Sequence, residues 1–501
     1  MSFYVTTPIF YVNGDPHLGH AYSTMAADVL ARHHRQRGDD TFFLTGTDEH
    51  GEPVEQAAER QGITPRELAD RNAPKFEAMA TAVDATNDFF IRTSDPRHMD
   101  RVAEVIQRVY DSGHVYEGVY EGWYCPRCAD FKTERELGPG YTCPIHEIVL
   151  EREREENWFF RLSAFEDDLK RLYAERPDFV VPRHRRNEAL AFIEGGLQDV
   201  SLSRPNLNWG LRLPWAPDQR MYVWFDALLN YYTALSFARE GEDLTDRYWP
   251  ATLHVLAKDI LKFHAVIWPA LMLAAELPPP DGMVIHGYLL LGEKKMSKSL
   301  GNVLDPNEVI DRFGADALRF YCLREVSFGH DGSVSPASFE TRYETELAND
   351  WGNLASRTLA MLDRYRDGVV PEGSPDPSVL EGDDGLAGIA EQVTALIDRA
   401  ELSGALEAIW ARVRRLNRYV EERAPWRLAK DDAAAGELDE VLYNLAEGVR
   451  TLALLLLAFM PASSERLLDA LGEPSRGIAT FGSRGGGAAT RRIPPLFPKV
   501  E

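Results

Sequence analysis

The stretch TPIFYVNGDPHLGH, residues 7–20, determines how the first part of this chain is expected to fold. A short apolar run, residues 3–6, comes before it, and a helical pattern, residues 21–36, follows it. Between them, residues 13–16 (NGDP) have the composition of a turn. A strand, a turn and a helix in this order point the free N–H groups of the first helical turn at an anion. The stretch therefore predicts an anion site, and a nucleotide phosphate is the anion we expect.

Two histidines on this turn add hydrogen-bond donors to the predicted site. His17 and His20 are three residues apart, and Gly19 leaves no side chain where a phosphorylated ligand must approach closely. Short motifs have many chance matches, and two histidines that merely solvate a helix start are the alternative interpretation. A second motif, far along the chain, favours the interpretation that these histidines bind phosphate.

The second motif is KMSKS, residues 295–299. It follows an apolar run, residues 283–291, and its glycine-flanked position predicts a loop. Two lysines with small hydroxyl residues suit a polyphosphate whose charge increases during a reaction. We expect both motifs to bind one triphosphate, through His17, Gly19, His20, Lys295, Ser297 and Lys298.

Together the motifs resemble the HIGH and KMSKS signatures of class I aminoacyl-tRNA synthetases, and the chain is similar to the methionyl-tRNA synthetase family over nearly its whole length. The resemblance implies an α/β fold: a Rossmann-type class I synthetase catalytic domain, an inserted connective peptide with a zinc knuckle, and a C-terminal α-helical bundle. It implies ATP-dependent joining of methionine to tRNA(Met), with His17, His20, Lys295 and Lys298 as catalytic residues. Mg²⁺ is expected with the ATP, held mainly by phosphates and water.

Length and composition are those of a multidomain globular protein. The 501 residues exceed one ordinary core, so about two to four domains are expected. The longest apolar run, residues 452–460, is too short to cross a bilayer. No signal peptide is visible and three of the four cysteines are clustered, so we expect a cytoplasmic protein without a membrane segment. The net charge of −24 does not exclude RNA, because a local basic patch can bind phosphates.

The patterns divide the chain into consecutive regions. The insertion is too short for the editing domain that valyl, isoleucyl and leucyl synthetases carry. A segment rich in Gly, Pro and Asp, residues 368–385, is the clearest linker. The predicted regions are the first half of the Rossmann catalytic domain (1–115), the connective peptide (116–220) with its knuckle at about 125–146, the second catalytic half with the KMSKS loop (221–325), a stem-contact linking region (326–367) and the helical anticodon-binding domain (368–501), whose reading face begins at the 347–365 helix.

The insertion contains a metal-ligand pattern. Cys125 and Cys128 are separated by two residues, and so are Cys143 and His146. Two such pairs form tight knuckles whose four donors can converge tetrahedrally on Zn²⁺. Protein donors fill every position, which predicts one structural zinc per chain. The pattern resembles the zinc knuckle of the methionyl-tRNA synthetase connective peptide in a Cys₃His version, and many relatives have a cysteine where His146 stands.

The resemblance also implies an amino-acid pocket. Asp48 ends the second predicted strand, where polar groups face the ligand crevice, and would hold the α-amino group. An aromatic stripe such as residues 221–231 is equally typical of a plain core, but aromatic faces suit a polarizable thioether. Asp259, after a strand predicted at 252–256, would meet the ribose of ATP. The implied methionine-binding residues are Ile9, Tyr11, Asp48, Trp224, Ala227, Tyr231, Ile260, His264 and Trp268.

The C-terminal part is predicted to be helical. Helices are expected at residues 308–326 and 347–365, and three amphipathic helices beyond the linker should pack as a bundle. Asn353 and Arg357 share one helix face, which on pattern alone indicates a solvated surface. The resemblance makes them, with Trp426, the readers of a CAU anticodon, because RNA-loop bases are read by edge hydrogen bonds and aromatic stacking. The apolar end of the tail is expected to dock on the bundle.

Other functions stay open at this point. A cysteine-specific class I synthetase also binds zinc, but in its active site rather than in an insertion. A small nucleotidyltransferase shares HxGH but lacks a KMSKS loop and a helical C-terminal domain. A non-catalytic tRNA-binding paralogue would be expected to lose part of the two motifs, and both are complete. The partners we expect are ATP, methionine and tRNA(Met), and because no domain follows the bundle, we expect a monomer.

Overall fold

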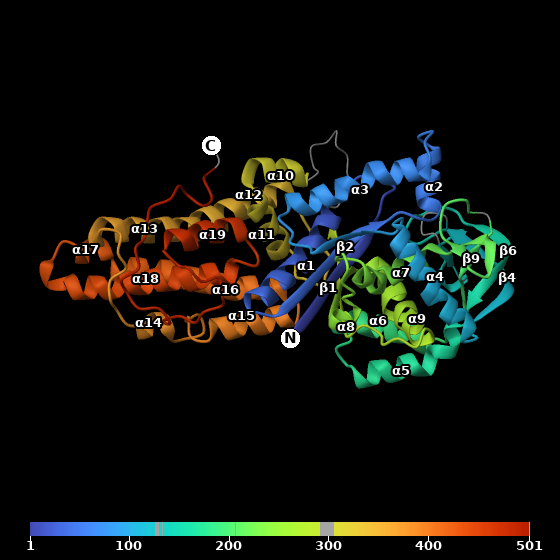
Figure 1. The fold of residues 1–501 in the computed structure, drawn as a ribbon. Helices are drawn as coiled ribbons and strands as arrows, with labels where there is room; N and C mark the ends of the chain where they lie inside the picture. Colours follow the sequence, from blue (N-terminus) through green and yellow to red (C-terminus); the bar gives the residue numbers. More distant parts are fainter. Residues whose placement is uncertain (126–129, 133, 206, 291–304, 500–501) are drawn as a thin grey trace.

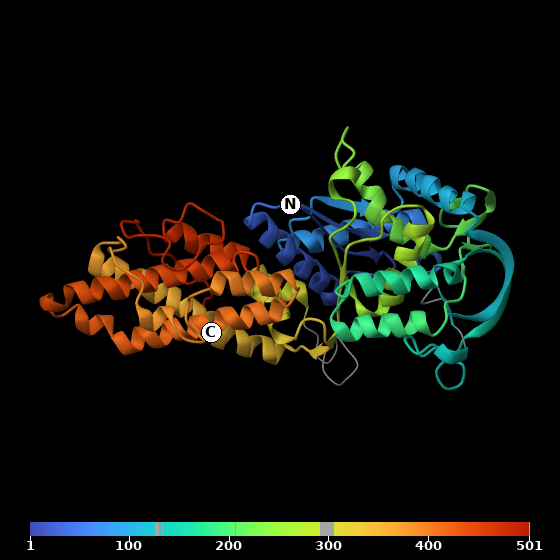
Figure 2. The same cartoon turned by 90° about the horizontal axis from the view of Figure 1, so that it is seen from below.

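The computed structural model describes residues 1–125, 130–132, 134–205, 207–290 and 305–499. The molecule is elongated, with a helical bundle at one end and a domain built on a parallel sheet at the other (Figures 1 and 2). The first and middle parts of the chain build the sheet, and the last part builds the bundle. The predicted architecture, an α/β domain followed by an α-helical region, is confirmed.

The parallel sheet places the ends of its strands around one crevice. Among the described residues its order is β3-β2-β1-β12-β13-β7, and all neighbouring strands are parallel. The chain runs outward from β1 on one side and from β12 on the other, which makes the β1/β12 boundary a switch point where such sheets bind ligands. The strands are β1 (Ser2–Tyr11), β2 (Asp40–Asp48), β3 (Phe89–Arg92), β7 (Val180–Val181), β12 (Leu253–Ala257) and β13 (Met283–His286).

The helices of the first half begin with clear capping signals. Thr64 and Glu67 exchange hydrogen bonds in a capping box at the start of α3, and Asp95 caps α4. The long first helix packs on β1 and β2. These helices are α1 (Leu18–Gln36), α2 (Glu52–Glu59), α3 (Pro65–Ala82) and α4 (Pro96–Asp111).

The predicted insertion forms the outer end of the sheet domain (Figure 1). Two long antiparallel strands, β4 and β6, are its spine, with β5 beside β4 and β8 beside β6. Helices α5 and α6 follow, and a smaller antiparallel sheet, β10-β11-β9, leads back. The elements are β4 (Val115–Cys125), β5 (Asp130–Lys132), β6 (Glu151–Phe160), α5 (Glu166–Glu175), α6 (Arg183–Glu194), β8 (Val200–Ser201), β9 (Ser203–Arg204), β10 (Arg212–Leu213) and β11 (Ala216–Met221).

One strand inside the range 116–220 joins the main sheet. Val180 of β7 lies opposite Met283 of β13, so β7 forms an edge of the parallel sheet. This pairing is not visible in the sequence, because two residues are too few to show a strand pattern. The insertion is therefore continuous with the sheet on this side.

The chain between the insertion and the bundle supplies β12 and β13 of the sheet and the helices that follow them. A helix, α7, begins at Val223, and a 3₁₀ turn and a π-helical segment follow β12. The elements are α7 (Val223–Thr233), α8 (Thr245–Tyr248), η4 (Lys258–Ile260), η5 (Phe263–Ile267), α9 (Trp268–Ala274), β14 (Leu289–Leu290), α10 (Pro306–Phe313), α11 (Ala315–Glu325), β15 (Gly332–Ser333) and α12 (Pro336–Arg342).

The single helix predicted at 308–326 is wrong. The structure has two helices, α10 and α11, because Gly314 between them has φ +85°, outside the helical region. The apolar pattern continues across the break, so periodicity alone could not show it.

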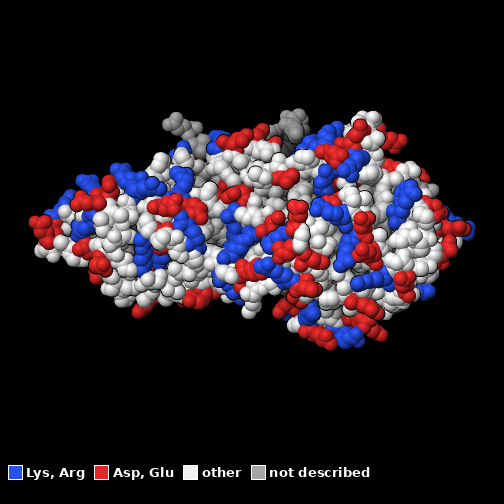
Figure 3. All heavy atoms as spheres, viewed as in Figure 1, with Lys and Arg blue, Asp and Glu red and all other residues white. Residues whose placement is uncertain are grey.

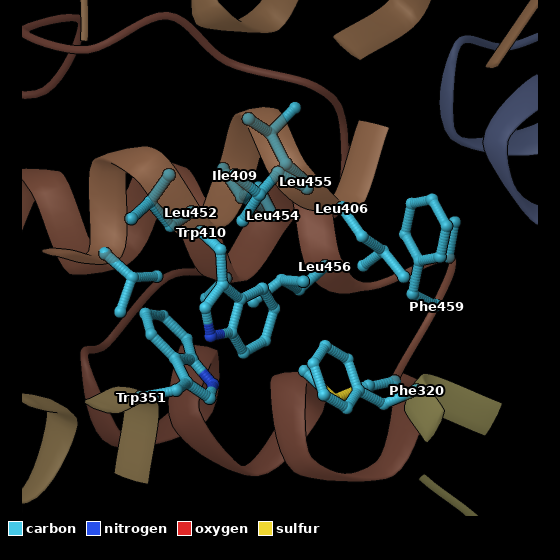
Figure 4. Close-up of a cluster of buried hydrophobic side chains, with 14 of the residues drawn as sticks. Phe320, Trp351, Leu406, Ile409, Trp410, Leu452, Leu454, Leu455, Leu456 and Phe459 are labelled. Carbon is cyan, nitrogen blue, oxygen red and sulfur yellow. The ribbon is translucent and has the colours of Figure 1, made fainter. Parts of the chain in front are cut away.

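The bundle packs against α11, so both ends of the molecule share one core. Figure 4 shows Phe320 of α11 among side chains from the bundle, including Trp410, Leu406 and Leu456. The rings of Phe320 and Trp410 have centroids 4.4 Å apart. The elements are η7 (Tyr343–Gly352), α13 (Asn353–Arg366), α14 (Pro377–Leu380), α15 (Ile389–Asp398), α16 (Leu402–Arg423), α17 (Pro425–Leu428), α18 (Ala435–Leu456) and α19 (Pro461–Ala470).

The segment 368–385 is not a free linker. Val370 donates its backbone N–H to Ala488 at 2.9 Å, and Val379 is completely buried. Its turn-forming composition fits a packed, irregular segment as well as an exposed one, so composition could not separate the two. The expected docking of the tail is confirmed, since Phe497 is buried and Tyr343 donates a hydrogen bond to the carbonyl of Pro498 at 2.8 Å.

Basic and acidic side chains do not form separate patches on the face of the molecule shown in Figure 3. In Figure 3, Lys and Arg are interspersed with Asp and Glu along both the bundle and the sheet domain. Although the net charge is −24, basic side chains are exposed along the whole visible face. None of the helices in the described ranges is both long and apolar enough to cross a membrane.

Candidate active site and metal-binding group

The predicted phosphate site is the start of α1. His17 is its N-cap: the Nδ1 atom accepts from the N–H of Gly19 at 3.1 Å, and the N–H of His17 donates to Nδ1 of His20 at 3.1 Å. The helix therefore starts at Leu18, earlier than the apolar pattern indicated, because an imidazole supplies the cap that Ser, Thr, Asp or Asn usually provides.

These two hydrogen bonds fix the protons of both imidazoles. Because each Nδ1 is an acceptor, the neutral ring carries its proton on Nε2. Burial lowers the pKa of His17, and burial together with the neighbouring His17 lowers the pKa of His20 to about 3. The rings stack at 3.7 Å, with Phe10 and Phe76 edge-on to His20. The site therefore presents two neutral N–H donors at a helix N-terminus.

The residues of the second motif, Lys295, Ser297 and Lys298, lie outside the described residues. Strand β13 ends against α1, where Nε2 of His286 bonds to Oγ of Ser23 at 2.7 Å. Ser23 is less than one turn beyond His20. The described chain before the motif therefore passes the helix that carries the histidines and then forms β14 beside β15.

Asp259, the predicted ribose contact, lies just after the carboxyl end of β12. Asp259 is exposed in the 3₁₀ turn that follows β12, and its carboxylate bonds to the side chain of Tyr288. Lys258 next to it pairs with Asp331 at 2.5 Å. Asp259 is therefore held at the carboxyl end of β12, next to the switch point.

Asp48 is a buried carboxylate with an unmet acceptor. It ends β2, opposite Tyr11 of β1, and is 3% exposed. The carboxylate accepts from the N–H of His50, but Oδ1 has no hydrogen-bond partner among the described residues. Burial, and then repulsion from Asp226, raises the pKa of Asp48 well above its usual value. A cationic donor would satisfy this group.

The predicted pocket residues come together beside Asp48. Tyr231 donates to Nε2 of His264 at 2.8 Å, and Nδ1 of His264 donates to the carbonyl of Ile260 at 3.1 Å. The rings of Tyr231 and Trp268 are 6.0 Å apart. Buried Ala227 lies one helical turn before Tyr231, and Ile9, Tyr11 and Trp224 pack on the same hydrophobic cluster. The polar atoms of Tyr231 and His264 satisfy each other, which leaves aromatic faces for an apolar ligand.

Two residues of this wall were missed by sequence reasoning. Phe263 stacks on Trp224 at 3.9 Å. His254 of β12 is fully buried: its Nε2 accepts from the indole of Trp268 at 3.2 Å, and its Nδ1 bonds to Thr6 at 2.7 Å. No motif marks either residue, and a histidine in a buried strand gives a signal only when its partners are known.

The described metal-ligand candidates form one group. Cys125, Cys143 and His146 have donor atoms within 4.8 Å of one another. The two sulfurs lie 3.9 and 3.7 Å from Nδ1 of His146. Zn–S and Zn–N bonds of about 2.3 and 2.0 Å place tetrahedral ligands about 3.6 Å apart, so one ion fits. Cys128 lies outside the described residues.

The predicted anticodon residues also lie together. Arg357 of α13 has its guanidinium carbon 5.6 Å from the ring of Trp426, and it donates to Glu421 at 2.8 Å. Asn353, one turn earlier on α13, is exposed. Arg357 and Trp426 thus lie side by side, and Asn353 lies on the same face of α13 one turn before Arg357.

The fold and the site define a class I aminoacyl-tRNA synthetase: a parallel sheet, a capped HxGH helix start and a helical C-terminal domain. The family model described as "tRNA synthetases class I (M)" matches residues 3–149 and 142–359. The methionine–tRNA ligase of Caldanaerobacter subterraneus subsp. tengcongensis is 42% identical over 509 residues, covering 100% of this chain and 79% of the relative. That of Streptomyces coelicolor is 42% identical over 522 residues, covering 100% and 97%.

A solved structure agrees in fold. Mycobacterium tuberculosis methionyl-tRNA synthetase in complex with methionyl-adenylate superposes with a TM-score of 0.93 at 41% identity, covering 99% of this chain and 100% of that one. The apo form of the same enzyme gives 0.86 at 37% identity. This chain belongs to the methionyl-tRNA synthetase family.

Proposed function

We propose that this chain is a methionine–tRNA ligase. The carboxylate of methionine attacks the α-phosphorus of ATP, which gives methionyl-adenylate and pyrophosphate, and the methionyl group then passes to the 3′-terminal ribose of tRNA(Met). The observation that carries this proposal is Asp48, a buried carboxylate with an unmet acceptor beside Tyr11 and Tyr231 of the aromatic pocket. Support comes from the mycobacterial relative, which was solved with methionyl-adenylate.

The substrate supplies its own nucleophile, so the residues act by position and charge. The Nε2–H groups of His17 and His20 donate to the phosphates of ATP, which enters with Mg²⁺. Lys295 and Lys298 close on the β- and γ-phosphates as negative charge moves toward pyrophosphate, with Ser297 beside them. Gly19 permits the close approach, and Asp259 bonds the ribose hydroxyls. Support for the convergence is the contact between Ser23 and His286, which holds the end of β13, the strand five residues before the undescribed segment, against α1.

Methionine binds with its ammonium on Asp48 and its side chain in the aromatic pocket. Trp224, Tyr231 and Trp268 face the thioether, while Ile9, Tyr11, Ala227, Ile260 and His264 shape the remaining wall. A neutral His264 supports this role, since burial lowers its pKa to about 4 and its hydrogen bonds end on Tyr231 and Ile260. The pocket then offers polarizable surface rather than competing polar groups.

The insertion holds a structural zinc, and the bundle reads the anticodon. Cys125, Cys128, Cys143 and His146 would bind Zn²⁺, whose chemistry there is to cross-link the knuckle. Asn353, Arg357 and Trp426 would pair with and stack on the bases of CAU. For the division into catalytic halves, insertion and bundle we propose the boundaries predicted from the sequence. Because one chain supplies every group named, we propose that it acts as a monomer, in the cytoplasm where tRNA is charged.

The test is ATP–pyrophosphate exchange measured with each of the twenty amino acids in turn. We expect exchange that depends on methionine, followed by charging of tRNA that carries a CAU anticodon. Exchange that depends on cysteine would instead support the related synthetase. Exchange with no amino acid, in a folded protein that still binds tRNA, would support a non-catalytic paralogue and overturn the proposal.

A further inference from the structure

A buried carboxylate behind Asp48 has no role in the reaction described so far. Asp226, in the first turn of α7, is 1% exposed. Its Oδ2 accepts from Nδ1 of His50 at 2.6 Å, and its Oδ1 accepts from Nε2 of His98 at 2.8 Å. The other nitrogen of His98 bonds to the hydroxyl of Thr233 at 2.7 Å. One carboxylate thus joins the end of β2, the helix α4 and the helix α7.

This cluster is stable in its charged form. Burial would raise the pKa of Asp226, but the two histidines outweigh it and lower the pKa to about 2. An ionised carboxylate can only accept, so His50 and His98 must each present an N–H to it. Buried ion and hydrogen-bond clusters of this kind fix geometry, because every member loses a partner if one moves.

The cluster reaches Asp48 through the backbone. His50 is two residues beyond Asp48, and its N–H is the donor to the Asp48 carboxylate. The hydrogen bond from His50 to Asp226 therefore sets where that N–H points. The ionisable groups that act on Asp48 are Asp226 and Tyr231 from α7 and Glu49, which directly follows β2. Glu49 is neutralised by Arg92 at 2.6 Å, which leaves Asp226 as the second negative charge.

We propose that Asp226, clamped by His50 and His98, is the positioning residue for recognition of the substrate's ammonium group. It fixes the loop that presents Asp48, and its charge makes the amino-group site select a cation. The inference rests on the proposed function and adds to it a residue that does not touch the substrate. Two adjacent carboxylates resist joint ionisation, so the arrival of an ammonium group drives the proton from Asp48.

The test compares two ligands that differ only in the amino group. Methioninol carries the ammonium, and its des-amino analogue is the same thioether alcohol without it. Both are titrated into the full chain by calorimetry near pH 8, for the wild type and for Asp226→Asn. We expect the substitution to weaken methioninol binding at least tenfold, about 1.4 kcal/mol, and to leave the analogue within about twofold.

The pH dependence gives a readout that loss of structure would not mimic. Methioninol affinity should fall toward low pH as Asp48 takes up a proton. In Asp226→Asn the midpoint of this fall should move to lower pH, because the repelling charge is gone. A midpoint that stays in place, or equal weakening of both ligands, would overturn the inference.

Two further variants keep the test decisive. Asp39→Asn removes the carboxylate of another histidine–aspartate pair, His34–Asp39 at 2.8 Å, far along α1, and should change neither ligand. Should Asp226→Asn not fold, Thr233→Val removes the outermost hydroxyl, which bonds to His98 at 2.7 Å and to the carbonyl of Asn230 at 3.4 Å. It should weaken methioninol binding more than binding of the analogue, by a smaller factor than Asp226→Asn. Weak binding of methioninol by the wild type itself would contradict the proposed function rather than this inference.

Discussion

The imidazoles of His17 and His20 show how a helix cap becomes a phosphate site. Each Nδ1 is used as a capping acceptor, which leaves each Nε2–H for a ligand. Both rings are neutral near pH 7, so they act as hydrogen-bond donors rather than as cations. Donors that need not reorganise are the ones most effective when charge develops on a phosphate.

Two substitutions at His20 separate capping from catalysis. Asparagine places Oδ1 near Nδ1 and keeps the capping acceptor, whereas glutamine places its amide N–H near Nε2 and keeps the donor. We expect His20→Asn to slow methionyl-adenylate formation by about a hundred- to a thousandfold, and His20→Gln to slow it much less. Single-turnover rates at saturating methionine and ATP measure both. Equal rates for the two variants would rule out Nε2–H as the functional group.

The predicted zinc knuckle is an element whose ligands can be tested one by one. Wild-type protein should contain about one zinc per chain, as expected of four protein ligands around one ion. Cys143→Ser should lose the metal, and His146→Cys should retain it, because a fourth thiolate is also a zinc ligand. Metal analysis of purified protein and its thermal unfolding check this. Full zinc content in Cys143→Ser would show that the metal binds elsewhere.

Sequence patterns located the elements that carry their own signals. Helix α3 is one of them, because Thr64 and Glu67, three residues apart in the sequence, form the capping box that begins it. The break at Gly314 and the strand β7 were not predictable, since one depends on a backbone angle and the other on pairing with a distant strand. The segment 368–385 was misjudged because its burial depends on the tail.

Sequence patterns likewise revealed only those site residues that belong to a recognisable motif. Motifs identified His17, His20 and the three described metal ligands, whose spacing is itself the signal. The resemblance supplied the pocket residues, and the structure brings them together beside Asp48. Asp226 and His254 carry no motif, because their function lies in hydrogen bonds to residues far away in sequence. Such positioning residues need coordinates to be found.

At the scale of the whole molecule, one buried ion pair joins the sheet domain to the bundle. Arg319 of α11 and Asp28 of α1 are both fully buried and 2.7 Å apart. The guanidinium also donates to the carbonyls of Val83, Ala458 and Phe459 at 2.8 to 2.9 Å. The side chain of Arg319 thus connects helix α1, which begins at the two histidines, to the residues that directly follow α18.

Breaking this pair should destabilise the protein strongly. Arg319→Met leaves Asp28 buried with a weaker set of partners, and we expect the free energy of unfolding to fall by about 3–5 kcal/mol. Arg32→Met removes the other, partly exposed partner of Asp28 and should cost less. Urea denaturation of both variants compares them. A loss for Arg319→Met no larger than that for Arg32→Met would contradict the assigned role.

Buried neutral histidines make the fold sensitive to acid. Burial lowers the pKa of His33 to about 3, of His264 and His286 to about 4, and of His254 well below its usual value. Between these values and about 6.5, the unfolded chain binds protons that the folded chain does not, so stability is lost as pH falls.

Each such histidine should contribute about 1 kcal/mol of lost stability between pH 7 and pH 5.5. Carboxylates whose pKa is lowered act in the same direction but titrate lower, near pH 4 in the unfolded chain, whereas a raised carboxyl pKa such as that of Asp48 acts in the opposite direction; the loss of stability in this window comes from the histidines. Urea denaturation at the two pH values measures the difference. Equal stability at both would mean that these rings are protonated in the folded protein.

The most direct test of the central claim is whether the two motifs act on one triphosphate. The measurement is the single-turnover rate of methionyl-adenylate formation in His20→Asn, in Lys295→Ala and in the double variant, with the dissociation constant of methionine measured alongside. We predict a large loss of rate in each single variant, a combined loss smaller than the product of the two, and nearly unchanged methionine binding. A wild-type rate in Lys295→Ala, or losses that multiply fully, would contradict the account.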